Sequence, residues 1–242
     1  QWLTAFGVAE ALLPAVVAPG SALGTVTAET AARFGLAPGT RVAAGTTDST
    51  AAFIATGARH PGEAVTSLGS TLVVKVLAQA PVFAPEYGVY SQPCRGLWLV
   101  GGGSNSGGAV LRQFFTDAQL RELTARLRPE QPTGLDYYPL PGPGERFPVN
   151  DAAFPPRLEP RPADAAVFLQ GILEGIAAIE AAAYRRLAEL GASYPSSVRT
   201  VGGGAQNPCW SRIRRRLLGV PVDRPRHGEA AYGAALLARN GG

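Results

Sequence analysis

Residues 198–223 read VRTVGGGAQNPCWSRIRRRLLGVPVD, and this stretch indicates the fold class most directly. A short run rich in β-branched residues, 198–201, predicts a strand, and three glycines follow it. Asn207 and Pro208 then occupy the N-cap and the first position of a helix expected over 208–218. A second strand is expected at 220–223. A strand, a glycine turn, a helix and a strand in this order predict an α/β domain.

The same alternation continues on both sides of this stretch. Upstream, residues 164–190 predict a long helix that ends at Gly191, and Gly171 and Gly175 lie on a side where another backbone could approach closely. Downstream, Ala230–Arg239 predicts a final helix. The stripe of apolar residues that faces the core in 164–190 recurs every three or four positions: Phe168, Ile172, Ile176, Ile179, Ala183, Leu187 and Leu190.

The first 163 residues predict a similar mixture of elements. We expect a helix over 3–17 that is broken at Pro14, and a capped helix within 25–36. Residues 64–77 predict a hairpin that turns at 68–70. Further elements are a strand at 42–45, a helix at 49–56, a strand at 97–100 and a helix at 109–115. The proline-rich residues 129–163 predict an ordered excursion anchored by Tyr137, Tyr138 and Phe147.

Composition excludes several classes of protein. The chain has 242 residues, of which 46% are hydrophobic and 17% charged, so it can bury a sizeable core and is not disordered. No run approaches the ~18 uninterrupted apolar residues of a membrane-spanning helix. Two cysteines are too few for a disulfide framework or an all-cysteine zinc site. With no basic leader at the start, these features predict a cytoplasmic protein without a membrane partner.

The net charge of +4 does not indicate a nucleic-acid partner. Lys75 is the only lysine among 22 basic residues, and the densest basic run, Arg212 and Arg214–Arg216, would spread around most sides of one helix. Nucleic-acid binders usually concentrate their charge on one stripe. We therefore expect this run to be solvated.

Three glycine-rich turns are candidates for a binding site: 68–71, 101–108 and 202–207. Glycine lets a ligand approach the backbone and exposes its N–H groups, and the third turn leads into a helix N-terminus that suits an anion. The alternative is that each turn is an ordinary tight connection. The spacing matches neither the G-x-G-x-x-G dinucleotide motif nor the phosphate-binding G-x-x-x-x-G-K-[ST] motif.

Asp48 is the one candidate for acid–base chemistry, because it stands where a strand is expected to meet a helix. Its carboxylate could accept a proton from a substrate hydroxyl, or it could cap the helix. His60 and His227 lack metal-ligand spacing, so no metal site is predicted. Cys209 is expected to be buried packing.

Three segments together resemble the second half of the FGGY carbohydrate kinases: 41–53 (RVAAGTTDSTAAF), 64–77 (AVTSLGSTLVVKVL) and 201–225 (VGGGAQNPCWSRIRRRLLGVPVDRP). That family consists of ATP-dependent sugar kinases with an actin-like, RNase H-like ATPase fold. The resemblance implies that Asp48 deprotonates the sugar hydroxyl and that residues 229–235 belong to a closing helix. It implies nucleotide binding by three groups: Gly69, Ser70 and Thr71; Gly103; and Gly202, Gly203 and Asn207.

Within the family, residues 88–115 and 135–148 are most similar to the D-ribulose kinases of cyanobacteria and chloroplasts. Gln92-Pro93 departs from the pattern expected of that subgroup. The resemblance therefore implies ATP-dependent phosphorylation of D-ribulose. A D-xylulose kinase is the alternative within the class, and a non-catalytic nucleotide-binding module of the same superfamily is the alternative outside it.

The resemblance also implies a division into domains. Residues 1–57 would be the end of the first kinase domain, and 58–242 the C-terminal, nucleotide-binding domain. The D-x-G-T phosphate loop that helps to hold Mg²⁺ in the family has no match in this sequence, so the fragment alone is expected to be inactive. The implied cofactors are ATP and Mg²⁺, and the implied partner is a small sugar, with a homodimer also allowed.

Overall fold

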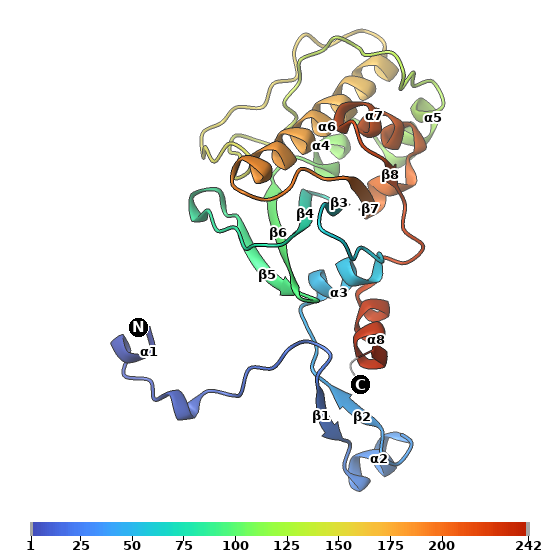
Figure 1. The fold of residues 1–242 in the computed structure, drawn as a ribbon. Coiled ribbons are helices and arrows are strands. Elements are labelled where there is room, and N and C mark those ends of the chain that lie inside the picture. Colours follow the sequence, from blue (N-terminus) through green and yellow to red (C-terminus); the bar gives the residue numbers. More distant parts are fainter. Residues whose placement is uncertain (1, 241–242) are drawn as a thin grey trace. The chain divides into compact units, whose positions relative to one another are not determined.

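The computed structural model describes residues 2–240, and the chain divides into two compact units. Among the described residues, the first unit contains 2–55 and 229–240, and the second contains 56–228. Strands alternate with helices along most of the chain (Figure 1), which confirms the predicted α/β class. The kinase-domain boundary expected after residue 57 stays a prediction.

The first unit contains a two-stranded antiparallel ribbon. The helix expected over 3–17 with a break at Pro14 is wrong, because Gly7 adopts a left-handed φ of 65° and the segment forms two short helical pieces. The helix expected within 25–36 is confirmed, with Thr27 accepting a hydrogen bond from the N–H of Thr30 at its start. The elements up to residue 43 are α1 (Trp2–Ala5), η1 (Glu10–Leu12), β1 (Ala22–Thr25), α2 (Ala28–Phe34) and β2 (Arg41–Ala43).

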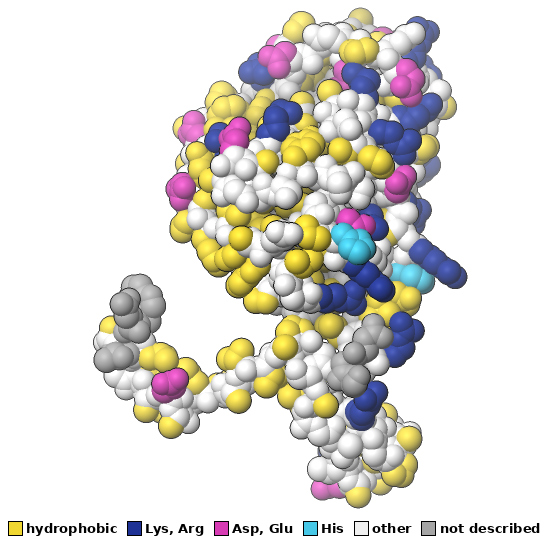
Figure 2. Space-filling model, in the orientation of Figure 1, with side chains coloured by type: hydrophobic (Ala, Val, Ile, Leu, Met, Phe, Trp, Pro, Cys, Tyr) yellow, Lys and Arg dark blue, Asp and Glu magenta, His cyan; other side chains and the backbone are white. Residues whose placement is uncertain are grey.

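Two further helices of the first unit pack against each other, α3 (Asp48–Ala55) and α8 (Ala230–Asn240). Gly233 lies directly against the carbonyl of Ala51, where any side chain would overlap the α3 backbone. Both helices were predicted. Elsewhere in this unit large apolar side chains remain exposed, among them Phe6, Leu12 and Val16. Figure 2 shows such apolar surface along the N-terminal segment.

The second unit is built on a six-stranded sheet in the order β5-β6-β4-β3-β7-β8. Its first four strands are antiparallel, whereas β7 lies parallel to β3 and β8 parallel to β7. The predicted hairpin at 64–77 is confirmed as β3 and β4. The strands are β3 (Glu63–Leu68), β4 (Leu72–Ala78), β5 (Tyr90–Cys94), β6 (Leu97–Ser104), β7 (Ser197–Val201) and β8 (Val222–Asp223).

Two strands differ from the sequence expectation. The strand expected at 97–100 continues to Ser104, so Gly101–Gly103 belong to β6 rather than to a turn. The edge strand β5 was not predicted; it contains Pro93, which is tolerated because β5 lies at the sheet edge. The glycine-rich turn is therefore shorter than expected.

Four helices complete the second unit, with two single-turn 3₁₀ segments. The hydrophobic core is assembled around α6, where the predicted apolar stripe is buried from Phe168 to Leu187 and Leu190 is partly buried. By length and composition α6 could span a membrane, but most of it is buried as the core helix. The elements are η2 (Pro85–Tyr87), α4 (Gly108–Phe114), α5 (Asp117–Thr124), α6 (Ala165–Glu189), η3 (Gly203–Gln206) and α7 (Pro208–Leu218).

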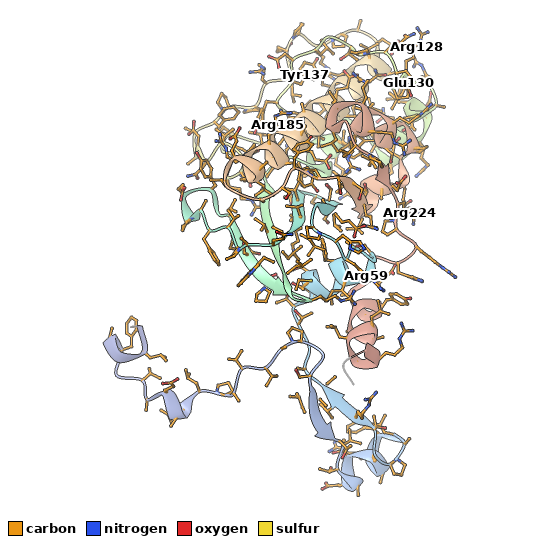
Figure 3. The ribbon with its side chains drawn as sticks, viewed as in Figure 1. Arg59, Arg128, Glu130, Tyr137, Arg185 and Arg224 are labelled. Atoms are coloured by element: carbon orange, nitrogen blue, oxygen red, sulfur yellow. The ribbon has the colours of Figure 1, made fainter. Side chains whose placement is uncertain are left out.

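The proline-rich excursion of 129–163 packs on α6, and the expectation of aromatic anchors within it is confirmed at Tyr137 and Phe147. Tyr137 and Phe147 are buried, and Tyr137, labelled in Figure 3, donates a hydrogen bond to the carbonyl of Pro160 at 2.5 Å. A side chain at Gly175 would lie 2.8 Å from the Tyr137 carbonyl oxygen. Glycine on this side of α6 therefore lets the excursion backbone approach closely, as the sequence suggested.

The expectation that the arginine run of α7 is solvated is wrong at its centre. Arg214 is 1% exposed and forms a bidentate pair with Glu180, with both N···O distances 2.6 Å. Thr66 of β3 donates to the same carboxylate at 2.5 Å, and Arg214 donates to Thr200 of β7 at 2.6 Å. Because Thr66 and Thr200 are register partners, this network joins both helices to adjacent strands.

Candidate nucleotide site

The three glycine segments converge on the turn between β3 and β4. On one side, the N–H groups of Gly108 and Ala109 donate to the carbonyls of Gly69 and Ser70, at 2.9 and 3.1 Å. On the other side, a side chain at Gly202 would lie 2.6 Å from the carbonyl oxygen of Leu68. The turn is therefore held between the start of α4 and the end of β7, and only glycine permits this closeness.

A cavity of about 640 Å³ opens beside these turns. Its volume is within the range of small-molecule and cofactor sites. Glycines form part of the wall: Gly69, Gly108, Gly203 and Gly204. Apolar side chains form another part, including Leu111, Leu120, Leu169, Leu173 and Trp210.

The start of α7 forms one end of the cavity. Asn207 is the N-cap, since its side chain accepts a hydrogen bond from the N–H of Trp210 at 3.0 Å, and Pro208 follows as predicted. The amide nitrogen of Asn207 also donates to the hydroxyl of Thr124 on α5, at 3.2 Å. Asn207 thus fixes the helix N-terminus against α5, and both residues line the cavity.

The predicted nucleotide residues do not all lie in the cavity wall. Four of them line it, namely Gly69, Ser70, Gly203 and Asn207. Thr71 instead lies under Gly107, and Gly202 packs against Leu68. These two residues shape the turns behind the wall.

Gly103 lies elsewhere, in strand β6. It lines a separate cavity of about 260 Å³, where a side chain would meet the guanidinium of Arg146 at 3.1 Å. Gly108, at the other end of the same glycine segment, is the residue that reaches the large cavity. The structure thus brings Gly108 of this segment to the large cavity and leaves Gly103 outside it, and nucleotide binding by the segment stays a prediction.

Sequence reasoning missed the wall formed by α5. This helix contributes Asp117, Leu120, Arg121 and Thr124 to the cavity. Its signal was present in the sequence, because Thr116 and Gln119 form a reciprocal capping box at the start of the helix. Arg112 of α4 was missed as well, and it lines the same cavity.

A buried carboxylate supports the second glycine segment. Glu145 is 1% exposed and accepts hydrogen bonds from the Ser104 hydroxyl at 2.5 Å, the Asn105 N–H at 2.8 Å and the Tyr138 hydroxyl at 3.1 Å. Burial and the negative charge of Glu145 both raise the pKa of Tyr138, so this hydroxyl remains a donor. The segment that leads to Gly108 is thereby tied to the excursion.

Glu63 lies at the start of β3, at the far end of this strand from the glycine turn, and accepts three hydrogen bonds. Burial raises the pKa of Glu63, but hydrogen bonds from the N–H groups of Arg59 and His60 and from the Arg199 guanidinium outweigh it. The result is a pKa lowered from 4.5 to about 2. The Glu63 carboxylate is therefore ionised in the folded protein at neutral pH.

Asp48 lies in the first unit, as the first residue of α3. The alternative that it is the N-cap is wrong: Thr47 caps this helix, because its hydroxyl accepts from the N–H of Thr50 at 3.4 Å and its carbonyl accepts from Ala51. Asp48 is exposed, and its carboxylate accepts the N–H of the adjacent Ser49 at 2.6 Å. Its carboxylate is therefore accessible to a substrate.

The remaining sequence candidates do not form a metal site. Among residues 2–240, no cluster of three or more His, Cys, Asp or Glu side chains could hold a metal ion. Cys209 is buried, with its sulfur 3.6 Å from the Thr124 carbonyl, as expected of packing. His60 and His227 are not assigned a role.

Residues 64–239 match the C-terminal domain of the FGGY family of carbohydrate kinases. The xylulose kinase of Streptomyces rubiginosus is 32% identical over 96% of this chain. An autoinducer-2 kinase of Escherichia coli is 27% identical over 94% of it. Each alignment covers 47% of the relative, so the chain spans about half the length of these proteins.

Solved structures of sugar kinases have the same fold. The "xyloylose kinase" of Brucella ovis superimposes with a TM-score of 0.85 and 29% identity, covering 99% of this chain and 52% of that one. The glycerol kinase of Plasmodium falciparum, solved with ADP, superimposes with a TM-score of 0.82, covering 99% and 50%. At 16% identity the second match shows the fold alone. The predicted actin-like ATPase fold is confirmed.

Proposed function

The chain belongs to the FGGY family of carbohydrate kinases, and from this premise we propose that it is the nucleotide-binding half of an enzyme that uses ATP to phosphorylate a ketopentose. One observation carries the proposal. Three glycine segments, distant in sequence, meet at Gly69 beside a cavity of about 640 Å³. Close backbone approach at these turns suits a phosphorylated ligand.

The cavity fits a nucleotide in shape and chemistry. Apolar side chains around Trp210 offer a surface for a base, and the exposed turn at Gly69 and Ser70 offers backbone groups to phosphates. Gly203 has nothing within 4 Å of the position that a side chain would take, so this wall leaves room for a ligand. When bound, ATP supplies the phosphoryl group.

Asp48 is the residue that we propose as the general base. Its carboxylate takes the proton of the attacking sugar hydroxyl, so that the oxygen can bond to phosphorus. Thr47 caps α3, which leaves the Asp48 carboxylate without a structural role in helix capping. We assign no Mg²⁺ ligand to this chain, although Mg²⁺ generally accompanies the nucleotide in phosphoryl transfer.

We propose two candidate sugars, in order of preference. Resemblance of residues 88–115 and 135–148 to the D-ribulose kinases suggests D-ribulose. The relatives favour D-xylulose as a second candidate, because two of them, at 31% and 32% identity, are xylulose kinases. Both sugars are ketopentoses with a terminal hydroxyl, so the proposed chemistry is the same. We place the enzyme in the cytoplasm.

A non-catalytic nucleotide-binding module remains the rival outside the class. It would need the cavity but not an accessible carboxylate at Asp48. The two functions differ in one measurable respect: only a kinase consumes ATP in response to a sugar.

The test is a substrate panel on the full-length kinase that carries this chain. ADP release is coupled to an indicator reaction with D-ribulose, D-xylulose, L-ribulose and glycerol, and sugar phosphate is identified by mass spectrometry. We expect a ketopentose to give the highest kcat/KM, with D-ribulose first. A tenfold preference for D-xylulose would change the proposed substrate, but the protein would still be a ketopentose kinase. Nucleotide binding with no sugar-dependent turnover would favour the module.

A further inference from the structure

Two arginines in the wall of the large cavity have their guanidinium groups free of ion pairs. Arg112 comes from α4 and Arg121 from α5, and both side chains are exposed. Within residues 2–240, neither is within 4.0 Å of a carboxylate. By contrast, the neighbouring helix α7 pairs each of its arginines with an acid: Arg212 with Glu130, Arg214 with Glu180, Arg215 with Asp223 and Arg216 with Glu174.

Arg112 is placed at the hairpin end of the cavity. The first N–H groups of α4 donate to the carbonyls of Gly69 and Ser70, which anchors this helix against the turn. Arg112 follows Gly108 by four residues, so the two share one face of α4, and both line the cavity. Arg112 therefore lies one helical turn from Gly108, whose N–H is bonded to the Gly69 turn that is proposed to contact phosphates.

Arg121 belongs to the part of the wall that α5 forms. It precedes Thr124 by three residues on α5, and both residues line the cavity. The Thr124 hydroxyl accepts a hydrogen bond from Asn207, the N-cap of α7. This end of α5 therefore lies beside the start of α7, where Trp210 belongs to the apolar wall that is proposed to receive the base.

We propose that Arg112 binds the phosphate chain of the nucleotide and that Arg121 binds its nucleoside. The proposal rests on the function proposed above, since ATP is taken as the ligand. A guanidinium donates paired hydrogen bonds to phosphate oxygens, and it can also stack on a flat aromatic ring such as a purine. With Asp117 as the other charged side chain in the wall, the cavity keeps an excess of one positive charge.

The experiment separates the two roles by using ligands that differ in their phosphates. Dissociation constants of adenosine, ADP and ATP are measured calorimetrically for the full-length kinase and for Arg112→Gln, Arg112→Lys and Arg121→Gln. We expect Arg112→Gln to weaken ADP and ATP roughly tenfold or more and to leave adenosine unchanged. Arg112→Lys should fall between this variant and the wild type.

The second role gives a different pattern. Arg121→Gln should weaken all three ligands by one common factor, roughly threefold or more. Arg126→Gln is the matched control, because Arg126 is also exposed, pairs with Asp164 and lies outside the large cavity. The Arg112 and Arg121 variants should keep the melting temperature of the wild type, since neither arginine forms an ion pair within residues 2–240.

Three results would overturn the inference. Arg112→Gln could bind ATP as tightly as wild type, or it could lose as much affinity for adenosine as for ATP. The third result is an Arg121→Gln variant that binds adenosine with wild-type affinity. Sugar phosphorylation by the same wild-type preparation separates this failure from that of the proposed function. If the kinase phosphorylates a sugar and Arg112→Gln has the wild-type KM for ATP, only the roles proposed for the arginines are refuted. If ATP binding depends on these arginines but no sugar is phosphorylated, only the proposed kinase activity is refuted.

Discussion

The N–H of Gly108 donates a hydrogen bond of 2.9 Å to the carbonyl oxygen of Gly69, joining two glycine segments that are 39 residues apart in sequence. Gly202 meets the same turn from the other side. The turn is thus positioned by backbone contacts that depend on missing side chains. Three glycine segments that looked like separate motifs form one structural unit at the cavity.

Replacing Gly202 by alanine should destabilise the protein. This glycine has a φ of 87°, and an added methyl group would lie 2.6 Å from the Leu68 carbonyl oxygen. Backbone strain and overlap together should cost about 2–4 kcal/mol of unfolding free energy, measured by urea denaturation. Gly203→Ala is the control, because that position is open, and it should change stability by less than about 0.5 kcal/mol. Equal losses of unfolding free energy in both variants would argue against the close approach of Gly202 to the turn at Leu68 and Gly69.

Replacing Gly203 by phenylalanine should remove nucleotide binding and leave the fold intact. The side chain would project into the open space beside the wall, where nothing lies within 4 Å. We expect ATP affinity to fall at least roughly tenfold, measured by calorimetry, because about 1.4 kcal/mol of lost contact suffices for that factor. Gly142→Phe, at an open position outside the cavity, should bind ATP normally. Unchanged ATP binding by Gly203→Phe would place the nucleotide elsewhere.

Breaking the buried pair of Arg214 and Glu180 should be severe. Arg214→Met leaves the Glu180 carboxylate buried without its cation, which typically costs about 3–5 kcal/mol of unfolding free energy. Glu180→Leu combined with Arg214→Met should recover part of the loss, because no buried charge remains. Arg212→Met is the control: Arg212 is half exposed and 3.9 Å from Glu130, so its loss should cost less than about 0.5 kcal/mol. Similar costs for Arg214→Met and Arg212→Met would contradict the network.

Stability should decrease in acid partly through Glu63. The pKa of Glu63 is lowered in the folded protein from 4.5 to about 2, so its ionised form stabilises the fold above pH 4.5, and this contribution is lost as the pH falls towards 2. The full effect is on the order of 3 kcal/mol. The advantage of wild type over Glu63→Gln, measured in urea, should therefore shrink between pH 6 and pH 3. The exposed Glu86→Gln serves as control, and an advantage for wild type over Glu63→Gln that is constant with pH would refute the assignment.

Local patterns predicted much of this fold because their causes are local. The hairpin at 64–77, the α7 cap at Asn207 and the apolar stripe of α6 depend on residues close in sequence. Arg214 could not be predicted as buried, because its partner Glu180 lies 34 residues away and on another helix. Gly103 was misplaced for a similar reason: only the pairing of β6 with β4 shows that it continues a strand.

The cavity was the least predictable part, because four separate segments build it. Its glycines were found from their types, but α5 was overlooked even though its capping box at Thr116 is a local signal. Asp48 was identified as a candidate base, whereas the competing cap had to be assigned to Thr47 from hydrogen-bond geometry. Residue types indicated the chemistry, but only the structure distinguishes the residues that line the cavity from those that shape the turns behind it.

The central claim is that Asp48 is the base of an ATP-dependent sugar kinase. Asp48→Asn keeps the side-chain shape and the oxygen that accepts the Ser49 N–H, and Thr47 still caps the helix. Only proton acceptance is lost, which typically lowers the rate by about 10²–10⁴-fold. Glu29→Gln is the matched control, since Glu29 is also an exposed acid in the first turn of a helix of the same unit.

The most direct measurement is kcat for ketopentose phosphorylation by the full-length kinase and these two variants, with the ATP dissociation constant and the melting temperature from the same preparations. We predict that Asp48→Asn binds ATP with wild-type affinity, melts within about 2 °C of wild type and loses at least a hundredfold in kcat, whereas Glu29→Gln is unchanged. An Asp48→Asn variant that keeps more than about a tenth of the wild-type kcat would contradict the account.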